Sequence, residues 1–245
     1  MVSDRNLDEF VMRMSEAAGA NLESIILFGS AVAGDFHPEF SNFNLFCVLR
    51  DTSFSALQPL APVARWWEGH KQPPPLIMTR AELHRSNDVF TIELLDMQQH
   101  HQVLLGEDVL LGLNIPRDLH RVQVEYELRE KLILLRQQLL LCSGKDRRLW
   151  ELLVYSVSSF VTLFRHALIV LGHAAPVAKR DAVQALAAHL HFDAAAILQV
   201  LDVREHKTSP KSMDVNELFA RYMAVVEQVT TAVDQAPGAD APAAS

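Results

Sequence analysis

The strongest constraint on the fold of this chain is a change in the spacing of its apolar residues near Asn114. Before that point, apolar residues come in short runs separated by Gly and Pro, whereas after it they recur at helical spacing as far as Asp234. This pattern predicts an α+β fold, in which a small mixed β-sheet domain precedes an all-α helical bundle. We predict domains at residues 1–112 and 113–235, and a disordered tail at residues 236–245.

The first domain is predicted to alternate short helices with strands. Helical spacing favours a helix over residues 5–18, and another should begin near Pro59 or Pro62, because Pro is favoured in the first turn of a helix. Thr79 and Glu82 have the spacing of a capping box, in which two side chains satisfy free backbone N–H groups at the start of a helix. The predicted strands are residues 21–28, 43–49, 76–78 and 89–95.

The second domain is predicted to be built from helices alone. The first should begin at Asn114 or Ile115, just before Pro116, and end near Cys142, where Ser and Gly follow. Asp residues are suited to cap two of the later helices, because a carboxylate accepts hydrogen bonds from the first backbone N–H groups. These later helices are predicted at residues 146–172, 178–191, 193–204 and 213–234.

Composition excludes several classes of protein. With 49% hydrophobic and 21% charged residues, the chain can bury a core, which argues against wholesale disorder and against a small disulfide-stapled scaffold. The two cysteines, Cys47 and Cys142, are expected to be free thiols in a reducing compartment. The N-terminus is acidic where a signal peptide is basic and then apolar, so the expected location is the cytoplasm.

Charge patterns argue against nucleic acids and membranes as partners. Residues 1–112 contain seven Lys and Arg against fifteen Asp and Glu, and residues 113–245 contain fifteen of each. Neither domain has the basic excess that nonspecific nucleic acid binding requires. Residues 152–172 are long and apolar enough to span a membrane, but Arg165 and His166 lie inside the segment. We therefore predict a buried helix of a soluble bundle there.

One local pattern is specific enough to indicate a family. Leu27-Phe28-Gly29-Ser30 is followed, eleven residues after Ser30, by Ser41-Asn42-Phe43-Asn44, which opens the second apolar run. This arrangement resembles the signature of the polymerase β-like nucleotidyltransferase superfamily, in which a strand ends in Gly-Ser, a helix begins there, and the next strand opens with Asp-x-Asp. The resemblance covers residues 4–110, and a helical C-terminal half is common among small-substrate and minimal members.

The resemblance implies a defined site chemistry. Gly29 and Ser30 are implied to bind phosphate, because Gly lets the backbone approach closely and a hydroxyl and free amides can donate to phosphate oxygens. In the superfamily the two aspartates lie on one face of their strand, because side chains alternate along a strand. They hold two divalent ions, with help from a third carboxylate on a neighbouring strand, and the ions align a nucleotide α-phosphate for transfer to a hydroxyl.

The chain departs from the superfamily at the two metal ligands, where Asn42 and Asn44 replace both aspartates. An amide offers a neutral oxygen and two N–H donors, so the change removes two negative charges from the metal site. We therefore expect no bound metal and no cofactor; Mg²⁺ and a nucleoside triphosphate are expected only if activity is retained. Glu93, in the fourth predicted strand, is our prediction for a vestigial third carboxylate, with Asp96 as second choice.

Other acids and histidines were weighed as replacement metal ligands. Asp35, Glu39 and Asp51 are near the motif in sequence, but they fall in the loop or beyond the strand, where they would not place two ligands on one face. Asp96 and His100-His101 have the spacing of a metal cluster on a helix. An exposed polar helix face is the favoured interpretation of that cluster.

Two further patterns have ordinary structural explanations. Arg65 and His70 have the Arg-x4-His spacing of RNases that accompany some minimal nucleotidyltransferases, but there the motif lies in a helical domain, so nuclease activity is not expected. Trp66 and Trp67 are expected in the core and not as a base-stacking platform. Residues 132–141 are more apolar than one core face needs, which favours a buried central helix over a dimer interface.

The sequence therefore predicts a nucleotidyltransferase-like protein whose catalytic metal site has degenerated, and which binds a ligand, a partner or itself. Weak nucleotide binding through Gly29 and Ser30 and a homodimer or protein partner on the helical domain are the expected interactions. One alternative is an active enzyme that transfers a nucleoside monophosphate to a hydroxyl of a small molecule, RNA or protein, using Glu93 and a single metal ion. A second alternative is a structural dimerisation module.

Overall fold

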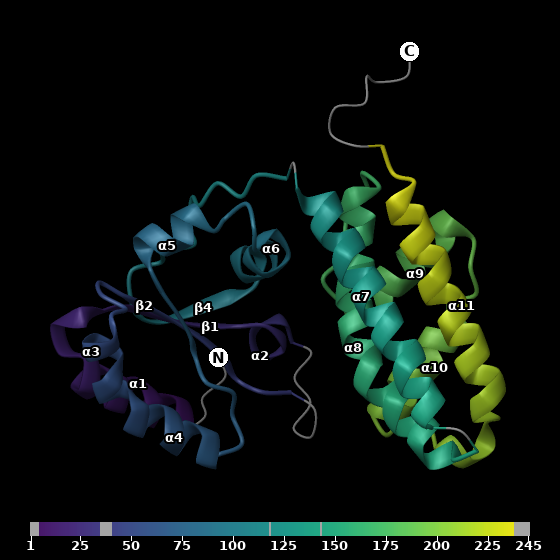
Figure 1. Ribbon diagram of the computed structural model, residues 1–245, viewed down its shortest axis with the longest axis horizontal. Coiled ribbons are helices and arrows are strands. Elements are labelled where there is room, and N and C mark those ends of the chain that lie inside the picture. Colours follow the sequence, from purple (N-terminus) through teal and green to yellow (C-terminus); the bar gives the residue numbers. More distant parts are fainter. Residues whose placement is uncertain (1–4, 35–40, 118, 143, 238–245) are drawn as a thin grey trace. The chain divides into compact units, whose positions relative to one another are not determined.

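The computed structural model describes residues 5–34, 41–117, 119–142 and 144–237. It divides the chain into two compact units, Met1–Pro116 and Arg117–Ser245, whereas the pattern of apolar residues placed the boundary after residue 112 (Figure 1). The predicted disorder of the tail concerns mainly residues 238–245, which lie outside the described residues.

The first unit is built on a mixed four-stranded sheet. Its strands are β1 (Leu22–Phe28), β2 (Asn44–Leu49), β3 (Leu76–Thr79) and β4 (His101–Gly106), in the order β3-β2-β1-β4. Strand β1 is antiparallel to both β2 and β4, and β3 is parallel to β2. The mixed sheet, and three of its strands, are as the sequence predicted.

Helices cover both faces of this sheet. Alternate residues of β1 and β2, such as Ile25 and Cys47, pack with Phe10 of α1 (Arg5–Ala18) and Trp67 of α4 (Ala61–Gly69). The intervening residues, such as Phe46, pack on the other face with α5 (Arg80–Arg85) and α6 (Thr91–Gln99) (Figure 1). The unit also contains two one-turn α-helices and two 3-10 turns: α2 (Ser30–Ala33), α3 (Phe54–Leu57), η1 (Gly19–Asn21) and η2 (Gln58–Leu60).

Local sequence signals explain two features of this unit. The Thr79 hydroxyl accepts the N–H of Glu82, and the Glu82 carboxylate accepts the N–H of Thr79, so the predicted capping box is confirmed. The Cys47 thiol is free and buried in β2, and burial raises its pKa to about 12. That thiol is therefore an apolar core group and not a nucleophile.

The predicted strand at residues 89–95 was wrong. This stretch belongs to helix α6, which buries Ile92, Leu94, Leu95 and Met97, and the place beside β1 is taken by β4. A short apolar run fits a buried helix as well as a strand, so periodicity alone does not separate the two. Glu93 is consequently an exposed residue in the first turn of a helix, not a strand residue.

The helical unit contains five α-helices within its described residues. They are α7 (His120–Leu141), α8 (Asp146–Val170), α9 (Lys179–Leu190), α10 (Ala195–Arg204) and α11 (Val215–Asp234), with one 3-10 turn at η3 (Pro210–Ser212). Helix α8 contacts each of the other four and forms the centre of the unit (Figure 1). Four of the five begin within two residues of their predicted first residue, and α7 is the exception.

Helix α7 begins at His120, later than the predicted start at Asn114 or Ile115. The Asn114 carbonyl accepts a hydrogen bond from the Asn87 side chain at 2.7 Å, and Ile115 is buried in the core of the first unit. These contacts hold the segment in a nonhelical conformation, which a signal based on Pro116 alone does not reveal.

Helix α8 is the one described helix that is long and apolar enough to cross a membrane, and 56% of its most apolar stretch is buried inside the structure. Arg165 and His166 are themselves buried. The His166 Nδ1 lies 2.9 Å from Nε2 of buried His120 on α7, close enough for one ring to donate to the other. These features make α8 the core helix of the bundle, as predicted.

We expect acid to destabilise the helical unit through this histidine pair. Burial, together with electrostatic repulsion from His166 and Arg117, lowers the pKa of His120 from 6.5 to about 4. The unfolded chain therefore binds the proton more tightly, so this contribution to stability is complete above pH 6.5 and is lost as the pH falls towards 4. The loss is about 2 kcal/mol at pH 5. Urea unfolding at pH 7 and pH 5 measures it, and an equal loss in His120→Asn would contradict the explanation.

Candidate functional site

The Gly-Ser motif forms a strand-to-helix turn at the end of β1. Gly29 follows the strand with φ 81° and ψ −151°, a combination that only Gly adopts readily, and α2 begins at Ser30. The Gly29 carbonyl accepts the N–H groups of Val32 and Ala33, each at 3.0 Å. The turn is therefore closed by its own backbone, and a strand ends and a helix begins at Gly-Ser, as the resemblance implied.

Asn44 lies directly beside this turn. It is the first residue of β2 and pairs with Phe28, the last residue of β1. A Cβ atom built on Gly29 would lie 2.8 Å from the Asn44 Nδ2, so the amide side chain reaches across to the Gly29 backbone. Register and side-chain contact thus bring the two halves of the motif together.

Asn42 lies two residues before Asn44, just ahead of β2. Asn42 is exposed, Phe43 is buried and Asn44 is half-buried, an alternation that places the two asparagines on one side of the chain and Phe43 on the other. The Phe43 N–H donates to Gln72 Oε1 at 2.8 Å, which fixes the chain just before β2. The two asparagines therefore lie on the same side of the chain just where β2 begins.

The strands beside β2 supply no carboxylate near Asn44. Strand β3 pairs Leu76 with Phe46, and the residues before Leu76 are prolines 73–75. Strand β1 has one acid, Glu23, but it lies next to Leu22, which pairs with Leu49 at the far end of β2. The Glu23 carboxylate is paired there with Arg80 at 2.8 Å. A third carboxylate on a neighbouring strand is therefore missing as well.

The structure describes three of the acids considered for this site, and none of them lies on a strand. Glu93 and Asp96 are on α6, which packs on the face of the sheet that includes Phe46. Asp51 lies beyond the other end of β2, and its carboxylate accepts the N–H and hydroxyl of Ser53 at 2.8 Å each, which lowers its pKa. Residues 35 and 39, the other two acids, lie outside the described residues.

The residues present do not fit a two-metal centre. Within residues 5–34, 41–117, 119–142 and 144–237, no three His, Cys, Asp or Glu side chains lie close enough to hold a metal ion. Beside the Gly29 turn lies the neutral amide of Asn44, whereas Mg²⁺ depends on anionic ligands. The arrangement suits hydrogen bonding to a ligand, not coordination of two cations.

His101 has a structural role that sequence reasoning missed. It opens β4 and pairs with Phe28, so it was misplaced when assigned to a polar helix face. Its Nδ1 lies 2.8 Å from the Met97 carbonyl, and its Nε2 lies 3.0 Å from Asp108 Oδ2. Burial raises the pKa of Asp108, but the hydrogen bond and charge of His101, together with the N–H groups of Leu110 and Leu111, outweigh burial and lower that pKa overall. The ring therefore ties α6 to the loop after β4.

The Arg65 and His70 pair is also structural. Arg65 is exposed on α4, and His70 Nδ1 lies 2.9 Å from the Trp66 carbonyl, with its ring 4.6 Å from the Trp66 ring. Trp67 is fully buried and packs on Phe10 at 4.9 Å, so its predicted place in the core is confirmed. Nothing in this group of residues is arranged around a ligand.

Comparisons with known proteins agree with this geometry at the level of the fold. No protein-family model matches the sequence, and no curated protein sequence matches it. Among solved structures, the chain is similar to the spectinomycin adenyltransferase AAD(9) from Enterococcus faecialis, determined with ATP and spectinomycin. The TM-score is 0.59 at 15% identity, covering 94% of this chain and 98% of that chain. The chain therefore has the α+β nucleotidyltransferase fold, with a mixed sheet followed by a helical region.

Proposed function

We propose that this protein is a catalytically degenerate nucleotidyltransferase-like protein that acts by binding and not by nucleotide transfer. The expected ligand is the phosphate group of a nucleotide, held weakly at Gly29 and Ser30 without a metal ion. The helical unit is the expected site for a protein partner. The cytoplasm remains the expected location, because the cysteines described are free and buried.

The observation that carries this proposal is the position of the Asn44 amide. Its neutral side chain lies against Gly29, at the sequence position where the superfamily resemblance has an aspartate. An N–H donor there repels a cation and attracts a phosphate oxygen. Because β1 and β3 add no carboxylate at this end of β2, neither neighbouring strand compensates for the lost charge.

Calorimetric titration with ATP, with Mg²⁺ or with EDTA, tests the proposal. We expect weak binding that changes by less than about threefold between the two conditions, because metal coordination contributes nothing. Ser30→Ala should weaken this binding, whereas Ser86→Ala, far along the chain on the end of α5, should leave it unchanged. An affinity that rises more than about tenfold with Mg²⁺ would contradict a metal-free site.

A second candidate function is nucleotide transfer with a single metal ion. It is favoured by one observation: α6, which carries Glu93, packs on the sheet face that includes Phe46, two residues after Asn44. Side chains two residues apart on a strand share a face, so Asn44 lies on the same face of the sheet as Phe46. Glu93 is therefore on the helix that covers the Asn44 face. This candidate predicts Mg²⁺-dependent transfer that Glu93→Ala abolishes.

A further inference from the structure

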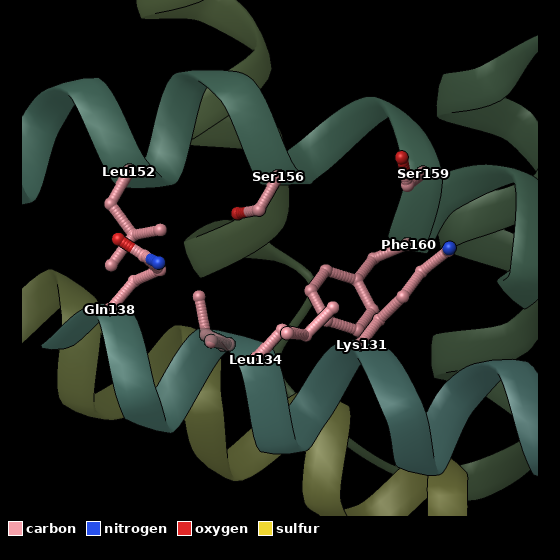
Figure 2. Close-up of a pocket in the computed structure, with 8 residues that line it drawn as sticks. Lys131, Leu134, Gln138, Leu152, Ser156, Ser159 and Phe160 are labelled. Carbon is pink, nitrogen blue, oxygen red and sulfur yellow. The ribbon is translucent and has the colours of Figure 1, made fainter.

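Helices α7 and α8 leave an apolar surface uncovered. Leu134 is 48% exposed, Leu141 is 65% exposed, and Tyr155 on α8 is 71% exposed. Between the helices lies a groove of about 170 Å³, and Figure 2 shows Leu134, Leu152 and Phe160 lining it. Its remaining wall is Leu135 with the polar side chains Lys131, Gln138, Ser156 and Ser159. We call the exposed side of α7 and α8 around Leu134 and Leu141 the α7–α8 surface.

Charge is arranged in order along this surface. Glu127 and Glu130 precede Leu134 and Leu141 at spacings of three, four and seven residues, so all four lie on one side of α7. Beyond Leu141, the turn into α8 contains Lys145, Asp146, Arg147 and Arg148, all exposed. Lys131 lies on the same side of α7 and pairs with Glu127, so the part before the apolar centre is net acidic and the part after it is net basic.

One hydrogen bond joins the basic turn to the apolar centre. Arg148 donates to the Leu141 carbonyl at 3.3 Å. Glu127 is paired with Lys131, and Arg147 with Glu151, each four residues apart on one helix. Pairs of this kind contribute only about 0.3–0.5 kcal/mol, so these side chains can be shared with a partner at little cost.

We propose that the α7–α8 surface binds a second copy of this chain in an antiparallel, two-fold arrangement. A two-fold axis between Leu134 and Leu141 brings the apolar centre of one copy onto that of the other. The same rotation places the basic turn of each copy over Glu127 and Glu130 of its partner. A surface that is acidic at one end and basic at the other is thus complementary to itself. This self-complementarity favours a second copy over an unrelated partner.

The inference names the partner left open in the proposed function, but it depends on no residue of the Gly29 turn. Its failure would therefore leave the proposal for the nucleotide site standing, and the converse also holds. Analytical ultracentrifugation of the full chain over a range of concentrations gives the dissociation constant of the dimer. We expect dimers in the micromolar range at low salt, with weaker association as salt screens the charges.

The apolar centre is tested by Leu134→Asp and Leu141→Asp. Each should raise the dissociation constant about 30-fold or more, because it buries a charge at the middle of the interface. The control is Phe54→Asp, which removes an apolar side chain of the first unit that is even more exposed, at 80%, and should leave the dimer intact. Circular dichroism melting confirms that each variant is folded.

The charges are tested by two reversed chains. One carries Glu127→Lys and Glu130→Lys, and the other carries Arg147→Glu and Arg148→Glu. Each should be about tenfold or more weaker as a homodimer, because like charges then meet at both ends of the interface. Mixed in equal amounts, the two should form a heterodimer, since every contact again joins acid to base.

Three results would overturn the inference. The first is a wild-type chain that stays monomeric at about 100 μM and low salt, where micromolar affinity gives mostly dimer. The second is a dimer unaffected by the Leu134→Asp and Leu141→Asp changes. The third is a mixture of the two reversed chains that associates no better than either chain alone.

Discussion

Restoring both aspartates, as Asn42→Asp with Asn44→Asp, is expected to create a divalent metal site. The two positions lie on one side of the chain beside the Gly29 turn, so two carboxylates there would share a cation. We expect the double variant to bind Mn²⁺ about 100-fold more tightly than the wild-type chain, a difference of about 2.7 kcal/mol. Electron paramagnetic resonance of free Mn²⁺ during titration measures the change directly.

A control separates ligand geometry from net charge. Asn216→Asp with Gln184→Glu adds the same two charges at exposed positions on α11 and α9, and should bind Mn²⁺ no better than the wild type. The restored site should still fail to transfer AMP, because neither β1 nor β3 supplies a third carboxylate near Asn44. Equal Mn²⁺ affinity in the double variant and the control would show that Asn42 and Asn44 do not converge.

Gly106→Ala is expected to destabilise the first unit by at least about 3 kcal/mol. Gly106 ends β4 with φ 81°, a conformation that costs other residues free energy. A Cβ atom there would also collide with the Glu23 carbonyl and the Ser24 Cα, which are backbone atoms of β1 and cannot move aside. The free energy of unfolding in urea measures the loss.

Gly112→Ala separates the two causes of that loss. Gly112 also has a positive φ, 75°, but no atom lies within 4 Å of a Cβ placed on it. Backbone strain alone should therefore cost about 1 kcal/mol at this position. If Gly106→Ala and Gly112→Ala lower the free energy of unfolding equally, the collision with the backbone of β1 would not explain the loss.

The sequence predicted correctly those elements whose local propensity and whose burial in the fold favour the same structure. The run of Ile25, Ile26 and Leu27 is both β-prone and buried, and it forms β1. The capping box at Thr79 needs only residues close in sequence, and it forms as expected. The long helices of the second unit follow one apolar period over many residues, so their existence was readily predicted.

Elements decided by distant contacts were not predicted. His101 begins a strand because it pairs with Phe28 of β1 and because its ring contacts Met97 and Asp108. No local apolar period predicts these contacts. The start of α7 depends in the same way on Asn87 holding Asn114. Propensity and period describe one segment at a time, whereas these positions are set by partners elsewhere in the chain.

The candidate site was predicted in part. The motif placed Gly29 and Asn44 together, and their side-by-side position in the structure agrees with it. The third carboxylate was predicted at Glu93 on a strand, but the apolar run that contains Glu93 forms helix α6. Only the strand order shows that β3, which directly follows three prolines, is the outer neighbour of β2.

Transfer of AMP from labelled ATP tests the central claim most directly. The assay uses the wild-type chain with Mg²⁺, and offers hydroxyl-bearing small molecules, RNA and the protein itself as acceptors. Because amides replace the anionic ligands beside Gly29, we predict no Mg²⁺-dependent labelling of any acceptor above a heat-denatured control. Labelling that requires Mg²⁺ and disappears in Glu93→Ala would contradict the account and establish an active enzyme.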